Sequence, residues 1–212
     1  MIKIIFLNFL LVLTLQSLSF GNNYVLSLEN NLLKNVSLLN PDKTFNAIIE
    51  IPSGSTEKWE INPEGNVLQR EFKDGKPRNI NYIGYPGNYG FFPQTLLDIK
   101  DVGDSDAIDV LIIGKRLNKG SVIRVKILGM LSMKDDGLTD NKVIAVLENS
   151  KFSKEIKDLN EFEESYPGIL QIIETWFKNY KGYKLEVTGF IEKNLTIQFI
   201  LNSHKNYLKN EK

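Results

Sequence analysis

Cysteine is absent from this 212-residue sequence, and histidine occurs only once, as His204. Without cysteine the chain has no disulfide framework, no thiolate nucleophile, no iron–sulfur cluster and no zinc site built on thiolates. A single histidine excludes a metal site made of several histidines and disfavours a Ser-His-Asp hydrolase. A charge excess is also lacking, with 26 basic and 26 acidic residues, which argues against a nucleic-acid or anionic-membrane binder. Any catalysis must therefore depend on carboxylates, Lys, Arg, Tyr and Ser.

Long apolar runs are missing as well, except at the N-terminus. Lys3 is the only charged side chain of the first twenty residues, Ile4–Leu15 is nearly all apolar, and small residues follow at Ser17 and Ser19. This pattern predicts a secretory signal peptide over residues 1–21. The apolar run is too short for a membrane span, which needs about 20 apolar residues. We expect export to the periplasm or the extracellular space, with no stable membrane association after cleavage. An uncleaved anchor, a buried core helix and a cytoplasmic protein are the alternatives.

The rest of the chain has the composition of a globular protein, with 42% hydrophobic and 25% charged residues overall. Residues 22–40 are polar and rich in asparagine, and we expect a surface arm there. Residues 41–212 are expected to form a single domain, because no internal repeat or linker divides them.

Short strands separated by turns make up most of that domain. Phe45, Ala47, Ile49 and Ile51 alternate with residues of the opposite face, which is typical of a strand. Further strands are expected at residues 58–61, 67–72, 109–113, 122–133, 142–147 and 184–191. Many short strands with frequent turns indicate a small barrel or sandwich.

Helical spacing appears only near the C-terminus. Ile169, Ile173 and Trp176 fall on one helical face, with Ser165 as the expected N-cap. A second helix is expected over residues 195–209. The sequence thus predicts an α+β protein in which a β-barrel is flanked by two C-terminal helices.

The chemical signal is a cluster of acidic residues just before an apolar strand. Asp104, Asp106 and Asp109 fall within six residues, and a divalent cation would relieve their mutual repulsion. Oxygen ligands without His or Cys favour Mg²⁺, Mn²⁺ or Ca²⁺ over zinc. An EF-hand fits poorly, because its sixth position would be Asp109 and its twelfth Lys115. A solvated acidic turn remains the alternative.

A second acidic group surrounds the turn at Asp136-Gly137. This turn would place Asp135 and Asp140 near one end of a barrel hairpin. Two carboxylate clusters that meet at one barrel mouth could hold two or more metal ions, as phosphoryl transfer requires. Side chains that suit a phosphate substrate are Lys58, Arg70, Lys142, Lys181, Tyr85, Tyr89 and Tyr180.

Together these segments resemble the soluble family I inorganic pyrophosphatases. Residues 104–110, Asp-Ser-Asp-Ala-Ile-Asp-Val, match the family's acidic signature except at Ala107, where proline is usual. The similarity continues at residues 49–52, 58–61, 85–95, 135–142 and 176–181, and it spans roughly residues 41–209. The resemblance implies a small closed OB-like five-stranded β-barrel with additional strands. It also implies hydrolysis of inorganic diphosphate to two phosphates by a water that divalent metal ions and an Asp general base activate.

The resemblance assigns roles to residues that match the family's motifs. Metal ligands would be Asp104, Asp109, Asp140, Asp135 and, in the outer shell, Glu50. The cofactor would be Mg²⁺, several ions per site, with Mn²⁺ as a possible substitute. Asp106 would accept the proton of the attacking water, beside Tyr89. Phosphate would be bound by Lys58, Arg70, Lys142, Tyr180 and Lys181. Glu60 and Tyr85 would support them.

Two longer segments, residues 96–103 and 162–170, are closer to the eukaryotic type of the family and favour a homo-oligomer, with a dimer preferred. The short link at residues 181–184 omits a loop that often closes over the site. Two other functions stay open from the residues alone. One is an OB-like binding module for oligonucleotides or sugars, and the other is an exported enzyme for larger phosphoanhydrides such as nucleotides or polyphosphate.

Overall fold

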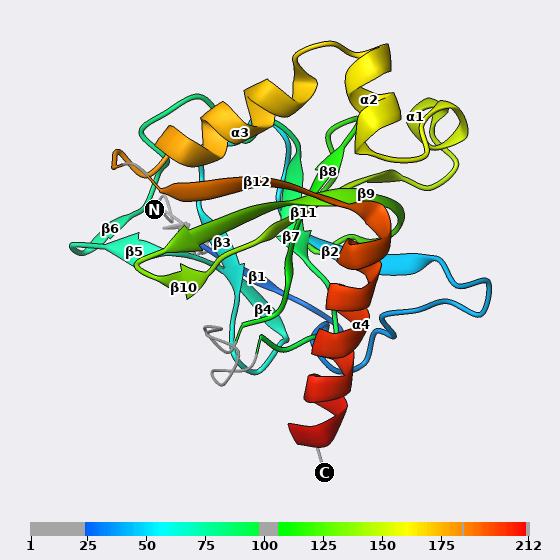
Figure 1. Cartoon of the computed structure of the whole chain (residues 1–212). Helices are drawn as coiled ribbons and strands as arrows, with labels where there is room; N and C mark the ends of the chain where they lie inside the picture. The colour runs from blue at the N-terminus through cyan, green and yellow to red at the C-terminus, as the bar shows by residue number, and fades with distance from the viewer. Residues whose placement is uncertain (1–23, 98–105, 184, 211–212) are drawn as a thin grey trace, which may run out of the picture.

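Five strands close into a β-barrel within the described residues, which are 24–97, 106–183 and 185–210 of this computed structural model (Figure 1). They are β2 (Phe45–Ile51), β7 (Asn88–Phe91), β8 (Asp109–Ile113), β9 (Val122–Asp135) and β11 (Lys142–Leu147). The order is β9-β11-β8-β7-β2, and β2 pairs again with β9, which closes the barrel. Strands β8 and β11 are parallel, and the other pairs are antiparallel. The closed five-stranded barrel implied by the sequence resemblance is confirmed.

Strand β9 organises the sheet because its 14 residues serve several partners. Its first half pairs with β2, and its second half pairs with β12 (Glu186–Glu192). Strand β10 (Leu138–Thr139) folds back on the end of β9 through Asp136 and Gly137, whose φ angles are 48° and 83°. Two successive positive φ values are what an Asp-Gly hairpin turn accommodates. This turn carries Asp135 to the end of the barrel, as the sequence predicts.

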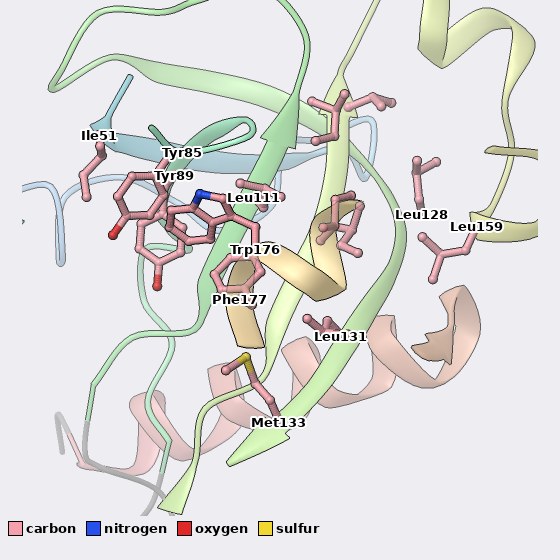
Figure 2. Close-up of a cluster of buried hydrophobic side chains, with 14 of the residues drawn as sticks. Ile51, Tyr85, Tyr89, Leu111, Leu128, Leu131, Met133, Leu159, Trp176 and Phe177 are labelled. Carbon is pink, nitrogen blue, oxygen red and sulfur yellow. The ribbon is translucent and has the colours of Figure 1, made fainter. Parts of the chain in front are cut away.

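The barrel strands bury both of their faces. In β8 and β11, successive side chains point to opposite sides, so Leu111 and Ile144 join one hydrophobic cluster, while Val110 and Val143 join another. The first cluster is covered by α3 (Ile169–Asn179), and Figure 2 shows Trp176 and Phe177 in it. The second is covered by α4 (Lys193–Asn210) through the fully buried Ile200. The barrel is therefore a solid support for the ends of its strands.

The segment expected to be a polar arm is part of the fold over its described residues. Strand β1 (Val25–Ser27) pairs with β4 (Val67–Arg70), which also pairs with β3 (Trp59–Ile61) to form a three-stranded sheet. The side chains of Leu32 and Leu38 are buried. Scattered leucines between polar residues anchor this segment, so packed structure begins before residue 41. The residues expected to form a signal peptide lie outside the described ranges.

Four helices occur in the described residues. The two expected C-terminal helices are α3 and α4, and two short ones precede them, α1 (Lys151–Glu155) and α2 (Leu159–Ser165). Ser165 does not cap α3, because it is the last residue of α2, which Asp158 caps. Gly168 instead begins α3, with a φ of 86°. A small hairpin of β5 (Phe72–Lys73) and β6 (Lys76–Pro77) completes the elements described. No helix of these ranges is long and apolar enough to cross a bilayer.

Candidate active site

One cavity of about 860 Å³ opens at the end of the barrel where the acidic clusters lie. It collects most of the side chains that the sequence singles out: Glu50, Lys58, Glu60, Tyr89, Asp106, Asp109, Asp135, Asp140, Lys142, Tyr180 and Lys181. They come from positions as far apart as β2 and the residues that follow α3, and the barrel brings them together. Arg70 and Tyr85 do not line it. Asp104 lies outside the described residues.

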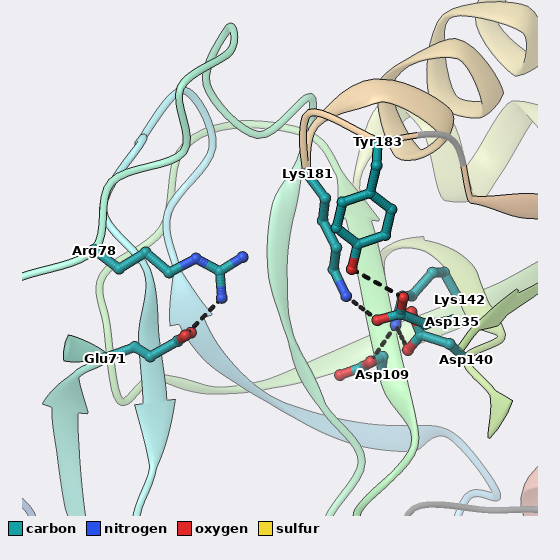
Figure 3. Close-up of polar contacts among 8 residues, drawn as sticks. All are labelled: Glu71, Arg78, Asp109, Asp135, Asp140, Lys142, Lys181 and Tyr183. Atoms are coloured by element: carbon teal, nitrogen blue, oxygen red, sulfur yellow. Dashed lines mark hydrogen bonds and ion pairs between the residues drawn. The ribbon is translucent and has the colours of Figure 1, made fainter. Parts of the chain in front are cut away.

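The centre of the site is set by two parallel strands. Asp109 and Lys142 are the first residues of β8 and β11, and the residues that follow them, Val110 and Val143, are directly paired. The two side chains therefore emerge next to each other. Lys142 Nζ lies 2.5 Å from Asp109 Oδ2 and also contacts Oδ1 of Asp140 (Figure 3). One ammonium thus joins the two acidic clusters, as expected for clusters that meet at one barrel mouth.

The charges of Lys142 and Asp140 depend on each other, because burial disfavours each isolated charge and the opposite charge beside it favours it. Burial lowers the pKa of the Lys142 ammonium, but Asp109 and Asp140 outweigh burial and hold that pKa above its usual value. Burial raises the pKa of the Asp140 carboxyl, and Lys142 offsets only part of the increase. Two carboxylates this close stay ionised only with positive charge between them. Lys142 supplies that positive charge here.

A second ion pair lies beside the first. Asp135, at the end of β9, accepts a hydrogen bond from Lys181 Nζ and another from the Tyr183 hydroxyl at 3.1 Å (Figure 3). Burial would raise the pKa of Asp135, but Lys181 outweighs burial, and the pKa is lowered. Asp135 is therefore a carboxylate at neutral pH. Asp135 ends β9 and Asp140 follows β10, so the two arms of this hairpin each bring one carboxylate to the cavity.

Two glutamates and Lys58 form the wall of the cavity near β3. Glu50 is only 6% exposed, its Oε1 accepts a hydrogen bond from the Ile61 backbone N–H at 2.7 Å, and burial raises its pKa to about 7 against the opposing effect of Lys58. Burial also raises the pKa of Glu60. Lys58 Nζ lies 5.6 Å from the centre of the Tyr89 ring. This wall therefore places the Lys58 ammonium beside the acidic side chains of Glu50 and Glu60.

Stacked aromatic rings form the floor of the site. The centroids of the stacked Trp176 and Tyr180 rings are 4.7 Å apart. Figure 2 shows Tyr85 between Trp176 and Tyr89, with ring centroids 4.5 Å and 5.1 Å away. Burial raises the pKa of Tyr89 and Tyr180 above the usual value, so both remain neutral phenols that can donate hydrogen bonds. Tyr85 is buried behind them, in a supporting position.

Arg70 is not where the sequence interpretation places it. Its guanidinium is buried and donates to Arg78 O and Asn79 Oδ1, each at 2.8 Å, and it pairs with Glu57 at 3.3 Å. Arg78 lines the cavity instead. It pairs with Glu71 at 2.6 Å, and Figure 3 shows its guanidinium extended toward the carboxylates. The arginine at this site is therefore Arg78.

The alternation of β4 explains the difference. Leu68 and Arg70 are its buried residues, whereas Gln69 points to the cavity. Arg78 follows the β5–β6 hairpin, which returns the chain beside Arg70. Side chains of a strand alternate between its two faces, so Arg70 points to the same side as the apolar Leu68. This alternation over residues 67–70 could have predicted from the sequence that Arg70 is buried. Nothing equally local marks Arg78 as a cavity residue.

The donor set suits a hard divalent cation. Asp109 and Asp140 share one ammonium, so their oxygens converge, and every nearby acidic group offers oxygen. No group of three acidic side chains in the described ranges is already arranged as a metal site. Asp106 is exposed at the cavity edge, next to the residues outside those ranges.

The model of the inorganic pyrophosphatase family matches residues 47–208. The chain belongs to this family. The mitochondrial inorganic pyrophosphatase of Saccharomyces cerevisiae is 38% identical over 191 residues, which are 78% of this chain and 62% of that protein. The longer, eukaryotic-like character expected from the sequence agrees with this relative.

Solved structures of the family share the fold. The crystal structure of a type I inorganic pyrophosphatase from P. falciparum superposes with a TM-score of 0.79 at 32% identity, over 84% of this chain and 63% of that one. The inorganic pyrophosphatase from Thermus thermophilus gives a TM-score of 0.69 at 28% identity, over 84% of this chain and 99% of that one. This chain spans little more than half the length of several curated relatives that it matches.

Proposed function

We propose that this chain hydrolyses inorganic pyrophosphate to two phosphates, with divalent cations and a general base. One observation carries the proposal: carboxylates and cationic side chains from distant segments line a single cavity at the barrel mouth. A small polyanion that arrives with metal ions needs both kinds of group, and a cavity with only one kind would repel one of them. Membership of the family supports the same substrate.

The acidic side chains would hold the cations. Asp109 and Asp140 would hold the central ions together with Asp104, which lies outside the described residues, and Asp135 and Glu50 would take part at the periphery. Bound Mg²⁺, or Mn²⁺ in its place, would lower the pKa of a coordinated water and neutralise phosphate charge. Until then, Lys142 and Lys181 balance the charge of the carboxylates.

Asp106 would accept the proton of the attacking water. Its side chain is exposed and lines the cavity, so a water molecule can reach it. Tyr89 would donate a hydrogen bond beside the nucleophile, because burial keeps its phenol neutral. A carboxylate is a weak base, and it serves here only for a water whose pKa is already low.

The phosphates would be bound by Lys58, Arg78, Lys142, Lys181 and the Tyr180 hydroxyl, all of which line the cavity. Arg78 replaces Arg70 in this set, since the Arg70 guanidinium is engaged elsewhere. Opposite charges of this kind stabilise a departing phosphate. Glu60 would adjust the position of Lys58, and Tyr85 would support the rings of Tyr89 and Tyr180.

Phosphate release from pyrophosphate by the purified chain tests this function. We expect release with Mg²⁺, slower or altered release with Mn²⁺, and none with excess chelator. Parallel assays with ATP and tripolyphosphate distinguish an enzyme for larger phosphoanhydrides. No phosphate release at saturating Mg²⁺ or Mn²⁺, together with salt-dependent binding of oligonucleotides, would favour the binding-module alternative.

We further propose that the protein is exported after loss of residues 1–21 and that it forms a homo-oligomer, with a dimer preferred. N-terminal sequencing of the mature protein from cell fractions tests the first point, and an intact Met1 in the cytosol contradicts it. Sedimentation equilibrium tests the second. Nucleic acid is not expected among the partners, because basic and acidic residues balance.

A further inference from the structure

The segment that follows β7 is bound to the segment that carries Asp106. Phe92 N–H donates to Ile108 O at 2.9 Å, and Leu97 N–H donates to Asp106 O at 2.9 Å. The Thr95 hydroxyl donates to Phe92 O at 2.7 Å and accepts from Ile108 N–H at 3.0 Å. Residues 92–97 and 106–108 are thus held side by side. The position of the Asp106 backbone therefore depends on the position of residues 92–97.

Helix α4 holds residues 94–96 from outside. The Ser203 hydroxyl accepts from Leu96 N–H at 2.9 Å and donates to Leu96 O at 2.8 Å, across 107 residues of sequence. His204 Nδ1 lies 2.6 Å from Gln94 O, and this carbonyl can only accept, so Nδ1 carries the proton. Ser203 is 4% exposed. Because α4 is fixed to the barrel through Ile200, these bonds relate the loop to the rigid core.

Gln94 shows that this geometry is imposed by its surroundings. Its φ is 54°, a left-handed value that costs a residue other than glycine about 1 kcal/mol. Three contacts hold it there: its N–H donates to Leu33 O at 3.0 Å, its side-chain amide donates to Lys34 O at 2.8 Å, and its carbonyl accepts from His204. A strained backbone conformation persists only where surrounding contacts hold it, and such residues cluster at functional sites. The contacts of Gln94 therefore indicate that the position of this segment matters.

We propose that Ser203 and His204 are positioning residues for Asp106. They act through Leu96 and Gln94, and they set where the carboxylate stands at the edge of the cavity. This rests on the proposed role of Asp106 as the general base. The lone histidine of the sequence would then serve catalysis without touching the substrate. A displacement of about 1 Å of a reacting group can lower a rate by about 100-fold, so modest shifts matter.

Two matched substitutions at residue 204 test the proposal in the full chain. H204N keeps an amide N–H near the place of Nδ1, whereas H204L has a similar shape without a donor. S203A removes both hydroxyl bonds to Leu96 and leaves only the longer bond, 3.3 Å, from Leu96 N–H to Ser203 O. T196A is the control: Thr196 is fully buried on the same helix, and its hydroxyl donates to Glu192 O at 2.8 Å, away from residues 94–97. Pyrophosphate hydrolysis at saturating Mg²⁺ gives kcat and KM, and urea unfolding gives stability.

We expect H204L and S203A to lower kcat about tenfold or more with KM changed less than about twofold, and H204N and T196A to stay near the unaltered chain. Normal kcat in H204L and S203A overturns the proposal. The proposal is also overturned if T196A loses as much kcat as H204L and S203A at the same loss of stability. Equal losses of kcat in H204N and H204L would overturn it too. Failure of the proposed function is separate, because the unaltered chain would then release no phosphate.

Discussion

Lys142 and Asp109 stand side by side at the starts of two parallel strands, with Nζ and Oδ2 2.5 Å apart. They are 33 residues apart in the sequence. Asp140 joins them from the turn before β11, so a single ammonium balances two carboxylates. A cation that binds these two carboxylates would therefore have to compete with Lys142 for them.

Removal of the Lys142 charge should destabilise the metal-free protein. Breaking a buried ion pair costs about 3–5 kcal/mol, and the partial exposure of Asp109 (29%) and Asp140 (16%) reduces our expectation for K142M to about 2 kcal/mol. Mg²⁺ should recover much of the loss, because it can neutralise the same carboxylates. Urea unfolding in chelator and in Mg²⁺ measures both. The exposed Lys115 provides the control K115M, and a K142M deficit unchanged by Mg²⁺ contradicts this account.

The general-base role of Asp106 predicts a loss of rate with cation binding retained. D106N should lower kcat by about 10²–10⁴-fold, the usual contribution of general acid–base catalysis. Thermal unfolding with and without Mg²⁺ should show the same stabilisation as in the unaltered chain. D136N makes the same chemical change in the exposed hairpin turn and should leave kcat unaltered. Equal kcat values in D106N and D136N would sink the assignment.

The two arginines should separate into a binding role and a structural one. R78M should lower kcat/KM for pyrophosphate about 10–100-fold and change stability by less than about 1 kcal/mol, because its guanidinium faces the cavity. R70M should cost about 1–3 kcal/mol of stability, since it removes the guanidinium that donates to Asn79 Oδ1 and Arg78 O and that pairs with Glu57, although Lys58 N–H still donates to Arg78 O and Trp59 still donates to Glu57. Steady-state kinetics and urea unfolding of both variants decide. The reverse pattern would return the phosphate-binding role to Arg70.

Glu50 should make the metal-free protein less stable as pH rises. Burial raises its pKa from 4.5 to about 7 on folding, so the folded state binds the proton more tightly than the unfolded state. Its contribution is fully present below about pH 4.5 and is lost as pH rises through about 7. One pKa unit corresponds to about 1.4 kcal/mol, so the loss is on the order of 3 kcal/mol.

The variant E50Q isolates the pH-dependent contribution of the Glu50 carboxyl to stability. The difference in unfolding free energy between E50Q and the unaltered chain should grow in favour of E50Q between about pH 4.5 and 7, and then stay constant. Urea unfolding in chelator at several pH values measures it. A difference that does not change with pH would show that Glu50 ionises in the folded protein as it does in the unfolded chain.

The elements of the fold were predictable where the pattern was local and long. Alternating apolar residues gave the strands near β2, β8, β9 and β11, and the Asp-Gly turn gave the β9–β10 hairpin. The helix boundary near Ser165 was not predictable, because Asp158 provides a competing cap and Gly168 takes the left-handed start. The burial of Leu32 and Leu38 was not predictable either, since isolated leucines in a polar segment show no period.

The sequence by itself determined the chemistry available to this protein: oxygen ligands, cationic side chains and phenols, with no thiolate and no group of histidines. It also determined the family, because the acidic signature and its flanking segments are specific. Only the tertiary structure decided which of these groups meet. The parallel pairing of β8 and β11 sets Asp109 against Lys142, the alternation of β4 buries Arg70 in favour of Arg78, and α4 brings His204 to Gln94. Each of these depends on strand pairing or helix packing between residues far apart in the chain, which no local pattern specifies.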